Sequence, residues 1–232
     1  MSTEHPKVLA FDVFGTVVDW HGSIWREAEA MIPGIDGDRF ASAWRAGYKP
    51  AMDEVRSGQR GWTKIDDLHR LILDRILNEF GITLDEMQRR ELNRAWHRLS
   101  PWPDTVAGMQ RLKSRFMLTT LSNGNLGLLA AMAKHAGLPW DLILSAEVFR
   151  HYKPDPETYL GVAEIFEVTP NEVMLVAAHE DDLDAARACG LQTAFIERIG
   201  EYGPNVRIPQ GDLTRFSYAA HDLHHLAEQL GT

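Results

Sequence analysis

The sequence contains little cysteine, fewer basic than acidic residues and no long apolar run. Cys189 is the only cysteine among 232 residues, which excludes an intramolecular disulfide and any Cys-x-x-Cys zinc site. The 24 Lys and Arg against 33 Asp and Glu give a formal net charge of −9. That charge argues against a surface built for nucleic acid or anionic lipid. No stretch approaches the roughly 18 apolar residues of a membrane span, so we expect neither nucleic acid nor a membrane as partner.

The N-terminal region also lacks the pattern of a secretory signal. No basic segment followed by a long apolar one precedes the first apolar run, which begins at Val8. Together with the single cysteine, this favours a reducing, cytoplasmic location. The overall composition, with 44% hydrophobic and 25% charged residues, is that of an ordinary globular protein.

The hydrophobic pattern predicts two kinds of structure along the chain. Residues 8–14 form a short apolar run with one carboxylate, as expected of a strand buried on both faces of a parallel sheet. Residues 20–97 contain long polar segments with helical periodicity. From residue 100 onwards, short apolar runs alternate with helical segments, which is typical of a parallel sheet. We therefore predict an α/β fold with a doubly wound, Rossmann-like core of residues 1–18 and 100–232. Residues 19–99 are predicted to form an inserted helical cap.

Four polar motifs lie at predicted strand ends or helix starts, where doubly wound sheets bind their ligands. A carboxylate buried at the end of an apolar strand is costly unless it is paired, and Lys153 is the natural partner for Asp12. An ionised and partly desolvated carboxylate can act as a covalent nucleophile, which is the role we expect of Asp12. The motifs are, in chain order, Asp12-Val13-Phe14-Gly15-Thr16, Leu121-Ser122-Asn123-Gly124, Tyr152-Lys153-Pro154-Asp155-Pro156 and Ala177-Ala178-His179-Glu180-Asp181-Asp182.

These motifs in this order resemble the haloacid dehalogenase superfamily, and the resemblance extends from Val8 to about Gly203. Phosphatases of that superfamily carry a second Asp two residues after the nucleophile, where this chain has Phe14. They also carry a magnesium-binding Asp where this chain has Ala178. Both differences point toward the metal-independent L-2-haloacid dehalogenases. The resemblance therefore implies a hydrolytic dehalogenase that needs no metal and no cofactor.

The resemblance also implies a role for each matched residue. Asp12 would attack C2 of a short, anionic 2-haloalkanoic acid, displace halide and form an aspartyl ester. One cap arginine would lie near the departing halide; Arg45 is preferred to Arg56, but the cap aligns too loosely to decide. The remaining implied roles are that Lys153 would pair with Asp12, Tyr159 would support that pair, Asn123 would cradle the halide, Ser122 and Thr16 would bind the substrate carboxylate or orient Asp12, and Phe14, Trp20 and Trp44 would wall the site.

The fourth motif departs from the pattern Ser-Ser-Asn-x-Trp-Asp that many members of the family have. This leaves two candidates for the group that activates the water hydrolysing the ester, with Asp182 first and His179 second. An unperturbed histidine titrates near working pH, which makes it a credible base. The match itself continues into Glu201-Tyr202-Gly203.

Two other functions stay open at this point. One is a magnesium-dependent phosphatase acting on a small phosphate ester, against which Phe14 and Ala178 argue. The other is a non-catalytic binding protein on the same scaffold, which the altered fourth motif allows and the retained Asp12, Lys153 and Asn123 oppose. Dimers are common in the family, so a homodimer is also open.

Overall fold

A six-stranded sheet forms the centre of the protein in a computed structural model that describes residues 5–204 and 206–232. The strand order is β5-β4-β1-β6-β7-β8, and every neighbouring pair is parallel. The prediction of a doubly wound α/β fold is therefore confirmed. The strands are β1 (Val8–Phe11), β4 (Met117–Ser122), β5 (Leu142–Ser145), β6 (Val173–Ala177), β7 (Gln192–Ile196) and β8 (Tyr218–Ala220).

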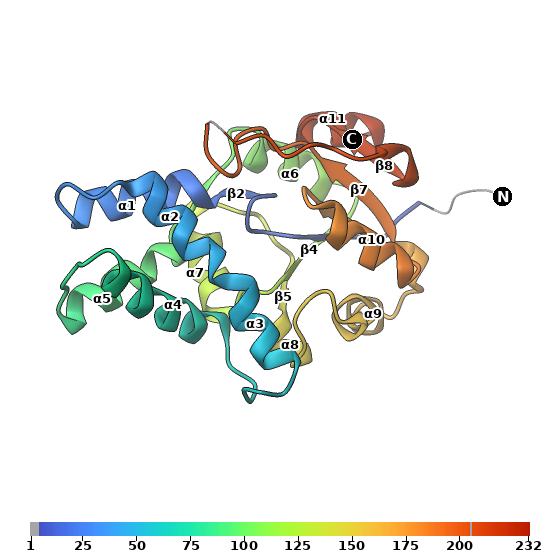
Figure 1. Ribbon diagram of the computed structural model, residues 1–232. Helices are drawn as coiled ribbons and strands as arrows, with labels where there is room; N and C mark the ends of the chain where they lie inside the picture. Colours follow the sequence, from blue (N-terminus) through green and yellow to red (C-terminus); the bar gives the residue numbers. More distant parts are fainter. Residues whose placement is uncertain (1–4, 205) are drawn as a thin grey trace.

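Helices cover both faces of this sheet, and a group of helices extends to one side of it (Figure 1). The covering helices are α6 (Thr105–Lys113), α7 (Leu126–Ala136), α8 (Ala146–Phe149), α9 (Pro156–Ile165), α10 (Glu180–Ala188) and α11 (Leu223–Gln229), with short 3-10 turns at Pro170–Glu172 and Leu213–Arg215. The group at the side consists of α1 (Trp20–Met31), α2 (Gly37–Ala46), α3 (Tyr48–Arg56), α4 (Ile65–Glu79) and α5 (Glu86–Asn93), followed by a 3-10 turn at Arg94–His97.

Burial of both faces of strand β1 explains why its residues are apolar without alternating with polar ones. Leu9 and Phe11 belong to the hydrophobic cluster that includes residues of α6, α7 and α11, whereas Val8 and Ala10 belong to the cluster with α9 and α10. Successive side chains of a strand point to opposite faces, and here both faces are covered. The strand expected over residues 8–14 ends at Phe11, because the chain turns at Gly15, whose φ of +86° lies in the left-handed region.

The side group of helices begins and ends at neighbouring points of the molecule. Strand β2 (Val18–Asp19) precedes α1, β3 (Ser100–Pro101) follows the last 3-10 turn, and the two strands pair antiparallel. The proposed boundaries at 18/19 and 99/100 therefore lie beside each other in space, and the division into core and cap domains stays a prediction. No helix of the described ranges 5–204 and 206–232 is long and apolar enough to cross a membrane.

The parallel arrangement brings three of the polar motifs together. Strands β4, β1 and β6 are adjacent in the sheet and end at Ser122, Phe11 and Ala177. Because parallel strands end at the same edge, the residues that follow each of them meet there.

Candidate active site

Asp12 lies directly after β1 and is almost fully buried, with 7% of its surface exposed. Lys153 Nζ donates to its Oδ1 at 2.9 Å, and Thr16 Oγ1 donates to its Oδ2 at 2.8 Å. His179 Nδ1 lies 3.2 Å from the same Oδ2. Thr16 is itself fixed, since its hydroxyl accepts the Ala178 N–H at 2.9 Å. The structure thus brings together four residues from three of the motifs singled out in the sequence.

The surroundings of Asp12 keep it ionised. Burial alone would raise the pKa of Asp12, but the Lys153 charge and hydrogen bonding with His179 hold that pKa well below its usual range. Burial would likewise lower the pKa of Lys153, but the charges of Asp12 and Asp182 raise it above its ordinary value. Both members of the pair are therefore charged at neutral pH.

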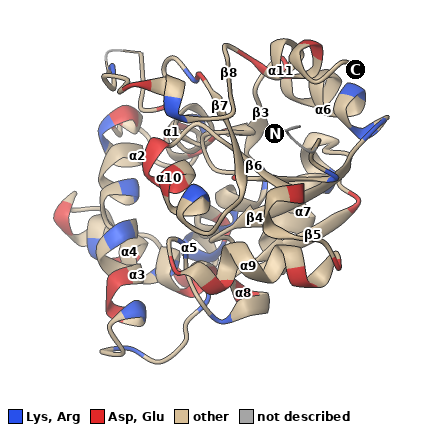
Figure 2. Cartoon of the chain, turned by 90° about the vertical axis from the view of Figure 1, so that its right-hand side faces the viewer, with Lys and Arg blue, Asp and Glu red and all other residues tan. Residues whose placement is uncertain are grey.

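Asp182 contacts the other side of the same ammonium group. Lys153 Nζ donates to its Oδ2, and the Tyr159 hydroxyl donates to its Oδ1 at 2.6 Å. Burial, followed by the repulsion of Asp12, raises the pKa of Asp182 against the opposing effect of Lys153. The residue lies in the acidic first turn of α10, visible in red at the start of that helix (Figure 2). Both oxygens of Asp182 are already occupied by protein donors.

His179 links Asp12 to a carboxylate that sequence reasoning did not single out as a site residue. Its Nε2 lies 2.9 and 3.1 Å from the two oxygens of Glu201, and Trp20 Nε1 donates to Glu201 Oε1 at 3.0 Å. Burial would lower the pKa of His179, but the charge of Glu201 and hydrogen bonding to Asp12 raise it to about 10. The only signal in the sequence was the family match at Glu201-Tyr202-Gly203, which assigned no role.

This shift predicts a pH dependence of stability. The pKa of His179 rises from 6.5 to about 10 on folding, so its contribution is complete below pH 6.5 and is lost as the pH rises through about 10. Between pH 7 and 10 we expect the free energy of unfolding to fall by roughly 3 kcal/mol more in the wild type than in His179→Asn. Urea unfolding at a series of pH values measures this difference. Parallel pH curves for the two proteins would contradict it.

A cavity of about 260 Å³ opens beside Asp12. A water molecule occupies about 30 Å³ in the liquid, so the cavity suits a ligand of a few heavy atoms. Arg45 and Tyr48 contribute to its wall from the helical side. Its other lining residues are Asp12, Phe14, Lys49, Met52, Asp53, Arg56, Asn123, Lys153, Pro154, Tyr159, His179, Asp181, Asp182 and Tyr202.

The two arginines proposed from the sequence differ in their partners. Arg56 donates to Asp155 at 2.8 Å and to Asp53 at 3.4 Å, so its charge is paired with carboxylates near the surface. The guanidinium carbon of Arg45 lies 4.2 Å from the centre of the Tyr48 ring, and its buried Nη1 has no hydrogen-bond partner among residues 5–204 and 206–232. Arg45 therefore retains a buried donor for a ligand.

Some of the remaining predicted residues line the cavity, and others lie outside its wall. Asn123 and Phe14 line the cavity, and the Asn123 side-chain carbonyl accepts the Lys153 N–H at 2.8 Å, which leaves its NH₂ group to act as donor. Ser122 is buried, and its hydroxyl accepts the Gly124 N–H at 3.1 Å in the turn after β4. Its predicted contact with a substrate carboxylate stays a prediction. Trp44 does not line this cavity; it packs edge-on against Phe40 and Trp96, and its Nε1 donates to the His69 carbonyl at 3.0 Å.

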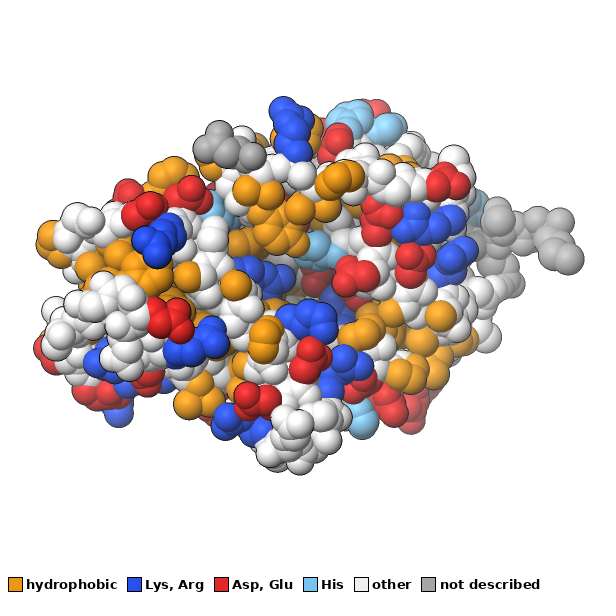
Figure 3. Space-filling model, viewed as in Figure 1, with side chains coloured by type: hydrophobic (Ala, Val, Ile, Leu, Met, Phe, Trp, Pro, Cys, Tyr) orange, Lys and Arg blue, Asp and Glu red, His pale blue; other side chains and the backbone are white. Residues whose placement is uncertain are grey.

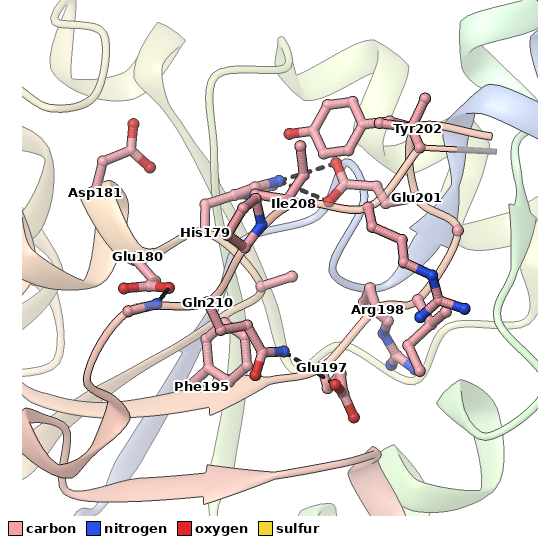
Figure 4. A pocket seen from close by; sticks show the side chains of 17 residues that line it. His179, Glu180, Asp181, Phe195, Glu197, Arg198, Glu201, Tyr202, Ile208 and Gln210 are labelled. Atoms are coloured by element: carbon pink, nitrogen blue, oxygen red, sulfur yellow. Dashed lines mark hydrogen bonds and ion pairs between the residues drawn. The ribbon is translucent and has the colours of Figure 1, made fainter. Parts of the chain in front are cut away.

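A second cavity, of about 700 Å³, adjoins the first (Figure 4). The two cavities share His179, Asp181 and Tyr202 in their walls. Figure 4 shows the Glu201 side chain extending from the loop after β7 to His179, with dashed lines between them. Tyr48 and Tyr202, which line the first cavity, were not found from the sequence because each stands in a segment without a recognisable strand-end motif.

The described side chains do not form a set of ligands for a metal ion. In the described ranges, no group of three or more His, Cys, Asp and Glu side chains is arranged so that it could hold one. Ala178, directly after β6, has no side-chain oxygen, and the position two residues after Asp12 is the buried ring of Phe14. Independence of metals stays a prediction, which the experiments below address.

Comparisons with known proteins show the family and the fold to which the chain is similar. Residues 6–190 match the family model described as haloacid dehalogenase-like hydrolase. The (S)-2-haloacid dehalogenase 4A of Burkholderia cepacia is 30% identical over 207 residues, which cover 84% of either chain. Crystal structures of an L-2-haloacid dehalogenase and of a defluorinating L-2-haloacid dehalogenase are 48% and 44% identical, with TM-scores of 0.93 and 0.92. Each superposition covers 98% of this chain, and 100% and 96% of the respective relatives.

Proposed function

The chain belongs to the haloacid dehalogenase-like hydrolase family, and on that premise we propose that it releases halide from short 2-haloalkanoic acids through an ester on Asp12, without a metal. The observation that carries the proposal is the buried, ionised carboxylate of Asp12 facing a cavity of about 260 Å³ that also exposes Arg45. A small 2-halo acid can enter such a cavity with its C2 atom near the carboxylate and its halogen near the guanidinium group.

In the first step an Asp12 oxygen attacks C2 of the substrate. A carbon–oxygen bond forms, the carbon–halogen bond breaks, and the halide leaves with the bonding electron pair. Arg45 and the NH₂ group of Asn123 are the donors that would stabilise the charge developing on the halide. Lys153 and Thr16 keep Asp12 ionised and fix its orientation while it attacks.

In the second step water hydrolyses the ester. The water oxygen bonds to the carbonyl carbon of Asp12, the bond from that carbon to the ester oxygen on C2 breaks, and a 2-hydroxy acid leaves with that former Asp12 oxygen as its hydroxyl group. One halide, one hydroxy acid and one proton are released in each cycle, and Asp12 is restored. Phe14, which is 4% exposed and packs edge-on against Trp96, helps to keep bulk water out of the site.

The electrostatics of the cavity matter because the protein as a whole carries a net charge of −9. Basic side chains gather around the hollow near the middle of the face shown in Figure 3, together with a few carboxylates. Within the cavity, Lys153 is balanced by Asp12 and Asp182, and Arg56 is balanced by Asp155. Lys49, which also lines the cavity, is balanced by Asp53. Of these basic side chains, Arg45 is the one without a carboxylate partner among residues 5–204 and 206–232, so it is the cation that an anionic substrate would meet. The cytoplasmic location and a homodimer stay predictions.

One assay separates the three candidate functions. The purified protein is incubated with L-2-chloropropionate or a haloacetate in EDTA, and free halide is measured. We expect release of halide at the same rate in EDTA and in added magnesium. Absence of halide together with magnesium-dependent cleavage of p-nitrophenyl phosphate would establish the phosphatase instead. Inactivity in both assays would favour a binding protein.

A further inference from the structure

We propose that Glu201 is a positioning residue that holds His179 as an imidazolium against Asp12 in the resting enzyme, and that esterification of Asp12 turns His179 into the base that activates the hydrolytic water. This inference rests on the proposed function, because it assigns the second step of that reaction. It concerns a carboxylate from the loop after β7, which none of the four motifs contains.

The two ring nitrogens of His179 each face a different carboxylate. Nδ1 lies 3.2 Å from Asp12 Oδ2, and Nε2 lies 2.9 Å from Glu201 Oε1. A carboxylate oxygen only accepts hydrogen bonds, so both contacts are satisfied together when both nitrogens carry a proton. The geometry by itself therefore selects the imidazolium form, and the raised pKa of His179, about 10, agrees with it.

Contacts on two sides fix the position of the Glu201 side chain. Its side chain is 5% exposed and accepts the Trp20 Nε1–H at 3.0 Å. It also occupies the space beside Gly15, where a Cβ atom would lie only 2.1 Å from Glu201 Oε1. The Glu201 carboxylate and the Gly15 backbone are both buried, so any residue larger than glycine at position 15 would displace the Glu201 side chain. The glycine of the first motif thus makes room for the carboxylate that orients His179.

Other charged groups near His179 do not replace Glu201. On α10, Asp182 accepts from Lys153 and Tyr159, and Asp181 is exposed at the rim. Arg45 reaches the cavity from α2, and its cationic charge opposes rather than favours the imidazolium. Asp12 and Glu201 are therefore the two anions that hold the proton on His179.

Esterification removes one of these two anions. When Asp12 becomes an ester its charge is lost, so the Nδ1 proton is no longer held by a carboxylate and can pass to solvent. Glu201 still accepts the hydrogen bond from Nε2–H, which keeps that proton on Nε2 and leaves the lone pair of the neutral ring on Nδ1. That lone pair lies beside the Asp12 carboxyl group, 3.2 Å from Oδ2, so a water molecule that donates to Nδ1 from the cavity would be next to the ester carbonyl carbon that it attacks.

The protons of this sequence balance. Nδ1 takes a proton from the attacking water and returns it to the oxygen of the leaving 2-hydroxy acid. The second proton of the water, left on the new Asp12 carboxyl group, then passes to Nδ1 and restores the imidazolium–carboxylate pair. The proton that His179 gave up after esterification is the one proton released in each cycle.

The test replaces Glu201 by glutamine, which retains the size of the side chain and an oxygen acceptor for Trp20. The imidazole signals of His179 are followed against pH by ¹⁵N NMR in the free protein and identified by their loss in His179→Asn. We expect the midpoint of the His179 titration to fall by at least one pH unit in Glu201→Gln. Glu197→Gln is the matched control, since Glu197 lines the same second cavity but contacts Gln210. An unchanged midpoint in Glu201→Gln would overturn the role of Glu201.

A second measurement follows the two chemical steps by rapid quenching. We expect Glu201→Gln and His179→Asn to slow ester hydrolysis at least tenfold, so that an ester on Asp12 accumulates and is detected by mass spectrometry of the protein. Ester hydrolysis at the wild-type rate in His179→Asn would show that another group activates the water. The titration needs no substrate, so it decides the role of Glu201 even if the wild type forms no ester, an outcome that would refute the proposed function itself.

Discussion

Replacing Asp12 by asparagine is expected to reduce halide release by about 10⁴-fold or more, because removing the nucleophile of a covalent mechanism removes the step on which every later step depends. The amide keeps the shape of the side chain and one oxygen toward Thr16, but it lacks the charge that Lys153 and His179 now pair with. Halide is measured over several hours with the wild type diluted in parallel, so that a small residual rate can be quantified.

The control for this variant is Asp53→Asn. Asp53 lines the same cavity, but its carboxylate pairs with Lys49 and Arg56 rather than with the reacting groups. We expect its rate to stay within a few-fold of the wild type. Loss of activity in both variants would indicate a general electrostatic effect of the acidic groups.

A single turnover in H₂¹⁸O tests the ester directly in the wild type. If Asp12 attacks C2 and water then attacks the Asp12 carbonyl, the first labelled oxygen enters the Asp12 carboxylate and the first hydroxy acid is unlabelled. Mass spectrometry of the peptide containing Asp12 detects the label. Label found only in the hydroxy acid would mean that water attacks C2 directly, with Asp12 acting as a base.

The part of the site that could be predicted from the sequence is the part that the sheet controls. Asp12 and Asn123 stand just after buried strands, and parallel strands in a doubly wound sheet end at one edge. The pairing of Lys153 with Asp12 followed from the cost of burying a lone carboxylate, although the two residues are 141 positions apart. In both cases a physical rule connects residues that are distant in the chain.

Glu201 could not be found in this way because no such rule applies to its loop. The contact between Trp20 and Glu201 spans 181 positions and joins α1 to the segment after β7. Neither hydrophobic periodicity nor strand topology determines where a loop places its side chains. The fourth motif was informative about His179 but said nothing about which carboxylate would face its second nitrogen.

The choice between the cap arginines shows the same limit. Arg45 and Arg56 both stand in the last turn of amphipathic helices, where sequence periodicity predicts a solvated side chain for either. Only the packing distinguishes them, since Arg56 meets Asp155 from the core, whereas Arg45 lies over the Tyr48 ring with one buried nitrogen unpartnered in the described part of the chain.

This difference predicts unequal effects when either arginine is replaced. We expect Arg45→Gln to lower kcat roughly 10²- to 10³-fold, the usual cost of removing one preorganised donor from a developing charge. Arg45→Lys retains the charge but not the planar set of donors, so it should recover only part of the rate. Arg56→Gln, the matched control on α3, is expected to change kcat less than about fivefold, because exposed ion pairs contribute little.

The rates of the two chemical steps, and their dependence on the halogen, test the role of Arg45 more sharply than kcat does. If Arg45 stabilises the departing halide, its loss should slow the formation of the Asp12 ester in rapid-quench experiments and leave ester hydrolysis unchanged, which is the opposite of the pattern expected for Glu201→Gln. The slowing should also be larger for a chloro than for a bromo substrate, because the poorer leaving group depends more on stabilisation of its charge. Equal losses in Arg45→Gln and Arg56→Gln, or a defect of Arg45→Gln confined to ester hydrolysis, would remove Arg45 from the halide site and return the choice between the two arginines to an open question.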